Sequence, residues 1–214
     1  MLNRYANSVQ FNHYNPCYCM RKFTLNPSVL GGFLFKPSII SKKIAKLEWN
    51  TIFTMSTILS QWFVSKRRQL TAGEIDFAKT IFANHIDYAK VEIVVHRLVM
   101  PHYAISPNGH IYFNRQDWKA DFSQESLELQ SWLIHELTHV WQVQQGISVI
   151  KKALFDRRYQ YVIKLGKSFL NYGIEQQAQM VQDYFIRINR GEECESLRQC
   201  IPFLPSSPNI NLKK

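Results

Sequence analysis

The sequence lacks a long apolar run and is poor in cysteine. No apolar stretch reaches the ~18–20 residues that a membrane-spanning helix needs, so we expect no transmembrane segment. The 4 cysteines among 214 residues do not make the dense framework of a small disulfide-stabilised protein. Cys194 and Cys200 are spaced to close a small loop in an exported protein, and two free thiols are the alternative.

Acidic residues are absent from the first 47 positions, which contain seven of the 26 basic residues. Most of the net charge of +10 therefore lies in an N-terminal arm, and the rest of the chain is close to neutral. The arm contains no nucleic-acid recognition motif, so we expect no specific nucleic-acid partner. A binder of nucleic acid or of membrane surfaces that acts through residues 1–47 remains one rival hypothesis.

The composition divides the chain into three parts. Residues 1–54 are interpreted as a basic, irregular extension, which lies outside the native protein if translation starts at Met55. Hydrophobic residues make up 46% of the sequence, which is enough for a folded core, and we place that core in a domain over residues 55–191. Residues 192–214 contain three prolines and are expected to form an irregular tail.

Local patterns predict a helix and two strands in the first half of this domain. Thr71 followed by Glu74 is the reciprocal capping pattern of a helix start. The β-branched stretch Val91–Val95 favours a strand. A proline, an asparagine and a glycine at 107–109 favour a turn before a second strand over 110–113. This second strand is a candidate sheet edge to which an extended peptide substrate could add.

Two long helices are predicted in the second half. Ser123 is a natural N-cap for the first, which is expected to end at Gly146. The second is expected to span residues 169–188 and to stop before Gly191. Together these patterns predict an α+β fold in which a small mixed sheet packs on two long helices.

The stretch "HELTHVWQ" lies within the first long helix and carries the chemistry. Four residues along an α-helix turn the chain by ~400°, so His135 and His139 project from one face about one turn apart. Two imidazoles in this arrangement can bind one Zn²⁺. Glu136 is then placed beside the metal, where its carboxylate can act as a general base. The alternative is a buried helix whose two histidines are satisfied by neighbouring groups.

A catalytic zinc site needs a third protein ligand and an open fourth position. Glu175 lies 36 residues after His139, a gap that allows a chain reversal and an antiparallel return past the first helix. Ala178, one turn further on the same face, is small enough to let the two helices approach closely. The sequence therefore predicts Zn²⁺ bound by His135, His139 and Glu175.

The segment Thr71–Phe185 resembles a small bacterial zincin of the gluzincin type, a group of zinc metallopeptidases. His135, Glu136, His139 and Glu175 match its zinc-binding and catalytic pattern position by position. The resemblance implies a zincin-like fold and zinc-dependent hydrolysis of a peptide bond. Domains with a similar pair of motifs are associated with Rhs and VgrG proteins of type VI secretion and polymorphic-toxin systems.

This chain departs from the gluzincin pattern at one position. Many gluzincins place an aspartate four residues after the ligand glutamate to orient a histidine, and Gln179 occupies that position here. The resemblance also implies a residue that stabilises the oxyanion. Tyr172, about one turn before Glu175, is the predicted residue, and Tyr159 and Tyr161 are the competing candidates.

The resemblance implies a secreted antibacterial effector, exported through a type VI-like system, and otherwise a cytoplasmic protein. Its expected partners are a peptide or protein substrate, a secretion partner of the VgrG or Rhs type, and an immunity protein. The rival hypothesis is a zinc-stabilised binding or accessory module of a secretion system that keeps the metal ligands without catalysis.

Overall fold

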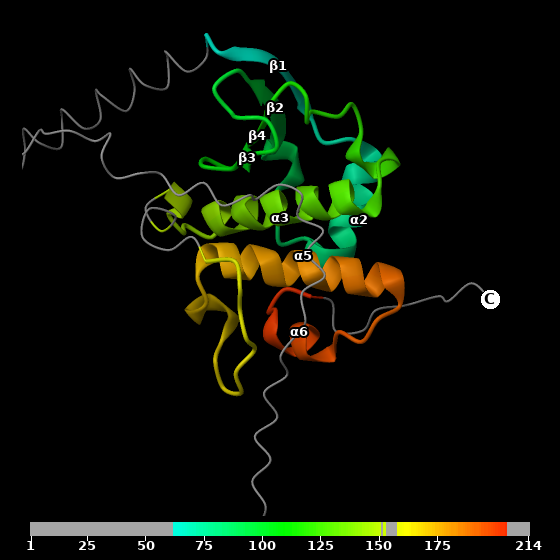
Figure 1. The fold of residues 1–214 in the computed structure, drawn as a ribbon, viewed down its shortest axis with the longest axis vertical. Helices are drawn as coiled ribbons and strands as arrows, with labels where there is room; N and C mark the ends of the chain where they lie inside the picture. The colour runs from blue at the N-terminus through cyan, green and yellow to red at the C-terminus, as the bar shows by residue number, and fades with distance from the viewer. Residues whose placement is uncertain (1–61, 151, 153–157, 205–214) are drawn as a thin grey trace, which may run out of the picture.

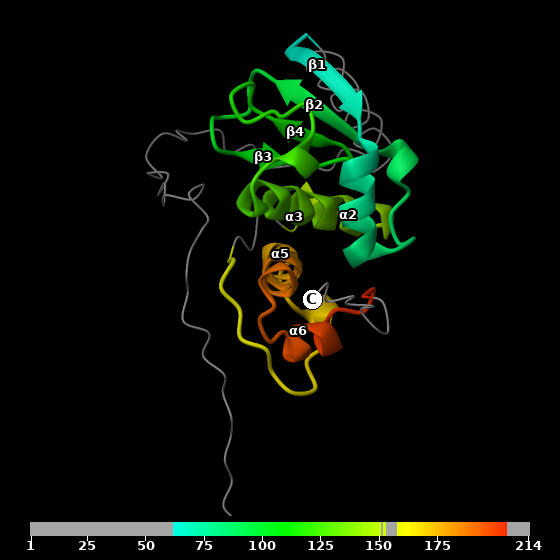
Figure 2. The same ribbon diagram turned by 90° about the vertical axis from the view of Figure 1, so that its right-hand side faces the viewer.

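The computed structural model describes residues 62–150, 152 and 158–204. These residues form three layers, with a sheet above helix α3 and helix α5 below it (Figures 1 and 2). No helix in this part of the chain has the length and apolar character needed to cross a membrane. The expected extension over residues 1–54 and the alternative start at Met55 lie outside the described residues.

The sheet is small and mixed, as expected. Its strands are β1 (Val64–Gln69), β2 (Glu92–His96), β3 (Ala104–Ile105) and β4 (Ile111–Phe113), in the order β1-β2-β4-β3. Strand β2 pairs with β4 in parallel, and the other two pairings are antiparallel. The prediction that the strand at 110–113 forms an edge is wrong, because β3 turns back through Gly109 and pairs along the outer side of β4.

Helix α2 (Ala72–Phe82) begins with the predicted capping box. The Glu74 amide donates to the Thr71 hydroxyl at 3.1 Å, and the Thr71 amide donates to the Glu74 carboxylate at 2.8 Å. The Glu74 side chain is fully buried and also accepts two hydrogen bonds from the Arg68 guanidinium of β1, at 2.6 and 2.7 Å. The same carboxylate therefore caps α2 and ties it to the sheet.

Helix α3 (Leu127–Gln144) begins three residues later than predicted, with Ser126 as its N-cap. Ser123 lies instead in a short 3-10 turn, Phe122–Gln124, in which the Asp121 carboxylate accepts a hydrogen bond from the Ser123 amide at 2.9 Å. Asp121 also accepts from the Thr71 hydroxyl at the start of α2, so a tertiary contact holds this segment out of the helix. The predicted end is confirmed, since Gly146 follows the helix with φ 77°.

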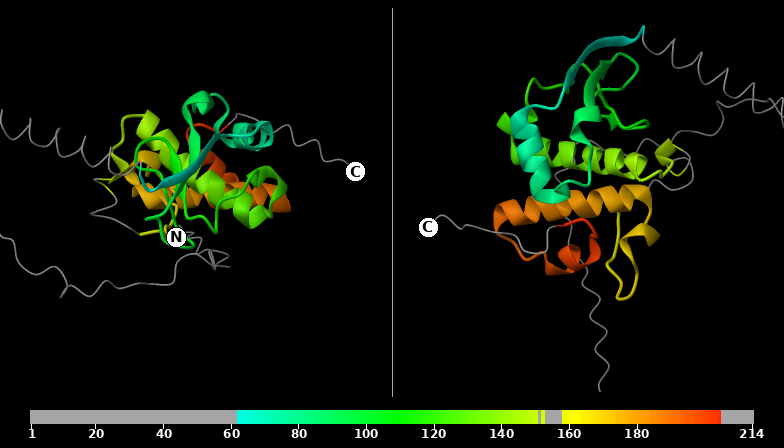
Figure 3. Two further views of the ribbon diagram at one scale, coloured as in Figure 1. Left: turned by 90° about the horizontal axis from the view of Figure 1, so that it is seen from above. Right: turned by 180° about the vertical axis from the view of Figure 1, so that it is seen from behind.

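Helix α5 (Ile174–Arg190) begins five residues after the predicted start. Residues Phe169–Asn171 form a 3-10 turn, and Gly173 becomes the N-cap, its amide donating to the Gln176 side chain at 3.0 Å. The helix ends at Gly191 in the left-handed conformation, as expected from the sequence. It runs antiparallel to α3 and alongside it, as the views from the front and from behind both show (Figures 1 and 3).

The expectation of an irregular tail from residue 192 is wrong for the residues up to 204. Helix α6 (Glu195–Cys200) follows α5, and Phe203 is buried beyond it. The Phe203 ring lies 4.7 Å from Trp141 and 5.2 Å from Phe82, between centroids. Because this ring fills space between α2 and α3, the segment belongs to the core. Cys194 and Cys200 are free thiols.

Candidate metal centre

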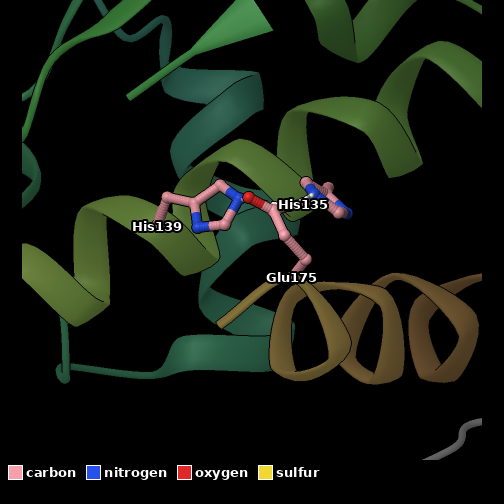
Figure 4. A group of neighbouring side chains, drawn as sticks. All are labelled: His135, His139 and Glu175. Atoms are coloured by element: carbon pink, nitrogen blue, oxygen red, sulfur yellow. Dashed lines mark ion pairs between the residues drawn. The ribbon is translucent and has the colours of Figure 1, made fainter. Parts of the chain in front are cut away.

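Three side chains from α3 and α5 converge between the two helices (Figure 4). Oε2 of Glu175 lies 3.4 Å from Nε2 of His135 and 3.3 Å from Nε2 of His139. The three ligand atoms all lie within 4.8 Å of one another, and the three residues are buried. The structure thus brings together the metal ligands predicted from the sequence, with Ala178 fully buried one turn beyond Glu175.

Two buried glutamines set the orientation of the imidazoles. Oε1 of Gln142 lies 2.9 Å from Nδ1 of His139, and Oε1 of Gln182 lies 3.1 Å from Nδ1 of His135. Each amide is fixed because its nitrogen donates elsewhere: Gln142 to the Ile174 carbonyl and Gln182 to the Ser131 hydroxyl.

An amide oxygen is only an acceptor, so both Nδ1 atoms must carry the proton. In the neutral tautomer, which is the form that binds a metal, Nε2 carries the lone pair, and both Nε2 atoms face Glu175. Without a metal, a proton on Nε2 hydrogen-bonds to that carboxylate instead. Metal-binding histidines commonly have such a hydrogen-bond partner at the ring nitrogen that does not bind the metal, and this partner fixes the tautomer and the orientation of the ring.

The gluzincin pattern assigns the orienting residue to position 179, whereas the imidazoles here contact Gln142 and Gln182. The Gln179 amide donates to the Asp183 carboxylate at 2.7 Å and so takes part in a different contact. Gln142 could have been found, because it follows His139 by three residues on the same helix. Gln182 reaches His135 across the helix interface, so only the packing of α5 on α3 reveals its role.

Interactions within the cluster shift the pKa values of Glu175 and His139. Burial by itself would raise the pKa of Glu175, but the hydrogen bonds from the His135 and His139 imidazoles outweigh it and hold this pKa well below its ordinary value. Burial likewise opposes the charged form of His139, yet its hydrogen bond to Glu175 and the charge of that carboxylate raise its pKa to about 9. The protein therefore keeps a carboxylate ionised at the centre of the cluster.

The donor set fits a divalent transition metal such as zinc. Bonds of ~2.0–2.1 Å in a tetrahedral arrangement place neighbouring ligand atoms ~3.3–3.4 Å apart. The distances from Glu175 to the two imidazole nitrogens, 3.3 and 3.4 Å, match that spacing. Within the described part of the chain the cluster has three members, so a tetrahedral metal held there would have one position left for a non-protein ligand.

Glu136 follows His135 in α3 and is not a member of the three-residue cluster. Its side chain is 4% exposed, and its Oε2 accepts a hydrogen bond from the Ser106 hydroxyl at 2.8 Å. Ser106 is itself buried and follows directly after the edge strand β3. The sheet therefore fixes one oxygen of this carboxylate, a contact that the sequence did not suggest.

The three candidate tyrosines occupy different environments. The Tyr172 hydroxyl donates to the Val162 carbonyl at 3.1 Å and accepts from the Lys164 amide at 3.0 Å, so it closes a loop. The Tyr161 hydroxyl donates to Asp183 at 2.6 Å. The Tyr159 ring, in contrast, stacks near His135 with 6.1 Å between centroids. The contacts therefore favour Tyr159 over the predicted Tyr172 as the tyrosine beside the cluster.

Comparison with solved structures identifies a homologue. The effector domain of Pseudomonas aeruginosa VgrG2b is 36% identical, with a TM-score of 0.56, over 64% of this chain and 83% of that domain. This chain belongs to the family of the VgrG2b effector domain. The relationship confirms the part of the sequence resemblance that pointed to type VI secretion effectors.

The full-length relative is much longer than this chain. The type VI secretion system spike protein VgrG2b of Pseudomonas aeruginosa PAO1 is 39% identical over 141 residues, which are 60% of this chain. The matched region spans 14% of the length of that spike protein. No protein-family model matches the sequence. The homology with VgrG2b therefore concerns its effector domain.

Proposed function

We propose that this domain is a zinc-dependent peptidase that acts as a type VI secretion effector. The observation that carries the proposal is the convergence of His135, His139 and Glu175 with a buried, non-ligating carboxylate, Glu136, beside them. A His₂Glu ligand set with an adjacent glutamate is the arrangement of hydrolytic zinc sites.

The residues of this chain have separate roles in the proposed reaction. When bound, zinc supplies Lewis-acid polarisation of the scissile carbonyl and lowers the pKa of water. Glu136 accepts a proton from the attacking water and passes it to the leaving amine. Ser106 holds one oxygen of Glu136 by its hydrogen bond and so restricts the rotation of the carboxylate. For the oxyanion role expected of Tyr172 we propose Tyr159 instead, because its ring centroid lies 6.1 Å from that of His135 while the Tyr172 hydroxyl is bonded to the loop backbone.

The effector part of the proposal rests on homology. The relative is described as a spike protein of a type VI secretion system, and its matching part as an effector domain. By this analogy we propose that the chain is delivered with a VgrG-type or Rhs-type partner, cleaves a peptide or protein in a target cell, and is neutralised by an immunity protein.

The alternative is a zinc-stabilised binding module without turnover. The burial of the cluster favours it, because His135, His139 and Glu175 are 5–9% exposed and offer little free surface to a substrate. The three-member ligand set opposes it, because a structural zinc site is normally closed by four protein ligands. The peptidase hypothesis accounts for a buried Glu136 that binds no metal, and the module hypothesis does not.

A pair of glutamine substitutions separates these hypotheses. Glu136→Gln keeps the shape of the side chain but cannot accept a proton. It should leave zinc content and thermal stability near those of the wild type and lower toxicity or peptide cleavage by ~10²-fold or more. Glu175→Gln should lower zinc affinity and stability together, because metal binding is coupled to folding. Full biological activity in Glu136→Gln would refute the peptidase and favour the binding module.

A further inference from the structure

The loop between residues 158 and 173 projects from the described domain at the end opposite the sheet. It appears in yellow below α5 and beside α6, and its tip is the point of the described chain furthest from β1 (Figures 1 and 2). The view from behind shows the same projection (Figure 3). Among the described elements, nothing extends beyond it on that side.

Hydrogen bonds give this loop a defined conformation. The Tyr172 hydroxyl bridges the two sides of the loop through the Val162 carbonyl and the Lys164 amide. The Gln176 side chain at the start of α5 donates to the Gln160 carbonyl. The loop is thus anchored at its base to the helix that carries Glu175.

A tight turn forms the tip. The Lys167 amide donates to the Lys164 carbonyl at 3.1 Å, and Gly166 at the third position has φ 79°. A positive φ at that position is characteristic of a type II turn and favours glycine. Leu165 at the second position is fully exposed to solvent, with a relative exposure of 106%. The turn therefore presents a leucine side chain outward.

Apolar side chains are exposed on the loop beside polar ones. Val162 and Leu170 are 43% and 56% exposed, whereas Tyr161, Ile163 and Phe169 pack against the core. The inward residues thus account for the attachment of the loop to the domain. The outward apolar residues contribute nothing to that attachment and remain in water, which marks them as candidates for contact with another apolar phase.

The positive charge of the loop favours an anionic partner. Residues 158–173 include no aspartate or glutamate, and Lys164 precedes Leu165 directly while Lys167 follows it by two residues. Lys164 is exposed, and the Lys167 ammonium lies 3.9 Å from the centre of the Tyr172 ring. The surface of an anionic bilayer has phosphate groups directly above the acyl chains. The exposed leucine can enter the apolar layer while the ammonium groups on either side of it contact the phosphates.

We infer that the loop between residues 158 and 173 docks this domain on an anionic lipid surface. Leu165 enters the boundary between headgroups and acyl chains, Val162 and Leu170 rest at the headgroup level, and Lys164 and Lys167 face lipid phosphates. Since the Tyr172 anchor is followed directly by α5, docking would hold the metal cluster at a set distance from the membrane. The inference does not depend on the peptidase activity.

The test uses the full chain and vesicles of phosphatidylcholine with or without phosphatidylglycerol. Leu165→Ser should lower binding to the phosphatidylglycerol vesicles by about tenfold, and the pair Lys164→Glu with Lys167→Glu by at least as much. Leu165 and Lys164 are exposed, whereas Lys167 is half-buried against the Tyr172 ring, so zinc content and circular dichroism equal to those of the wild type are required of each variant before its binding is compared. The N-terminal arm is also basic, so the differences between variants are the readout.

Matched controls separate the loop from general charge. Leu98→Ser removes a leucine that is 64% exposed on the sheet side, and Arg97→Glu with Arg115→Glu changes the net charge by the same amount as the lysine pair. The controls should bind the vesicles as the wild type does. Equal losses in loop and control variants, or no loss in the loop variants, would overturn the inference and point to charge alone or to a protein partner.

Insertion has its own readout. Leu165→Trp should keep the affinity for phosphatidylglycerol vesicles and gain fluorescence that lipids with brominated acyl chains quench, beyond the quenching of the native tryptophans. Quenching equal to that of the wild type would show that the tip does not enter the bilayer and would refute the proposed docking.

Discussion

Replacing Gln142 with methionine tests whether the glutamines behind the histidines prepare the metal site. Gln142 is fully buried, and its amide joins His139, the Ile174 carbonyl and the Gln177 side chain at 2.9–3.1 Å. Methionine fills a similar volume but offers no comparable acceptor or donor. The His139 ring then loses the acceptor that fixes its Nδ1 proton and its orientation.

Two effects of Gln142→Met can be estimated separately. Loss of a hydrogen-bonding partner behind a metal-binding histidine typically lowers metal affinity by ~10–100-fold, or ~1.4–2.7 kcal/mol. The groups left without a partner in the interior should also lower the free energy of unfolding of the metal-free protein by ~1–3 kcal/mol. Competition with a chromophoric chelator measures the first quantity, and denaturant unfolding in the presence of a strong chelator measures the second.

Gln179→Met is the matched control for this experiment. The gluzincin resemblance places the orienting residue at 179, whereas the structure places Gln179 against Asp183. Zinc affinity should therefore be unchanged in Gln179→Met and reduced in Gln142→Met. A Gln142→Met protein with wild-type affinity, or an equal loss in the two variants, would refute the proposed role of the glutamines.

Two further predictions concern Ser106 and pH. Ser106→Ala should lower turnover by about tenfold without changing zinc affinity, because the Ser106 hydroxyl donates to Glu136 and not to a proposed zinc ligand. Ser106→Thr keeps a hydroxyl and should restore much of the rate. Unchanged turnover in Ser106→Ala would show that catalysis does not use this hydrogen bond. The pKa of His139 is raised from 6.5 to about 9, so its contribution to the stability of the metal-free fold is complete below pH 6.5 and is lost as pH rises through about 9. Zinc competes with that proton, so zinc affinity should increase across the same window, and an affinity independent of pH there would contradict the assignment of His139 as a ligand.

Local sequence signals correctly predicted those features that depend on neighbouring residues along the chain. The spacing of His135 and His139 places both imidazoles on one face of a helix whatever packs around it. The capping box at Thr71 and the glycines after the two long helices are satisfied within a few residues of themselves. Glu175 could also be predicted, because a helical return past the motif needs only a suitable length of chain.

The errors lie where a distant group competes with a local signal. Ser123 has the chemistry of an N-cap, but Asp121 engages both its amide and the Thr71 hydroxyl, and α3 starts later. The tail contains prolines typical of irregular structure, yet Phe203 is drawn into the core against Trp141. In both cases the outcome depends on contacts between segments far apart in the sequence.

The sequence alone determined which side chains can bind a metal, because helical periodicity makes the positions of His135 and His139 a local property. The tertiary structure decided how those side chains are prepared for binding. Gln182 and Ser106 reach His135 and Glu136 from other elements, and they do so only because α5 and the sheet pack on opposite sides of α3. Hydrogen bonds act over about 3 Å, so a partner from another element exists only once the packing of the domain has brought it within that distance.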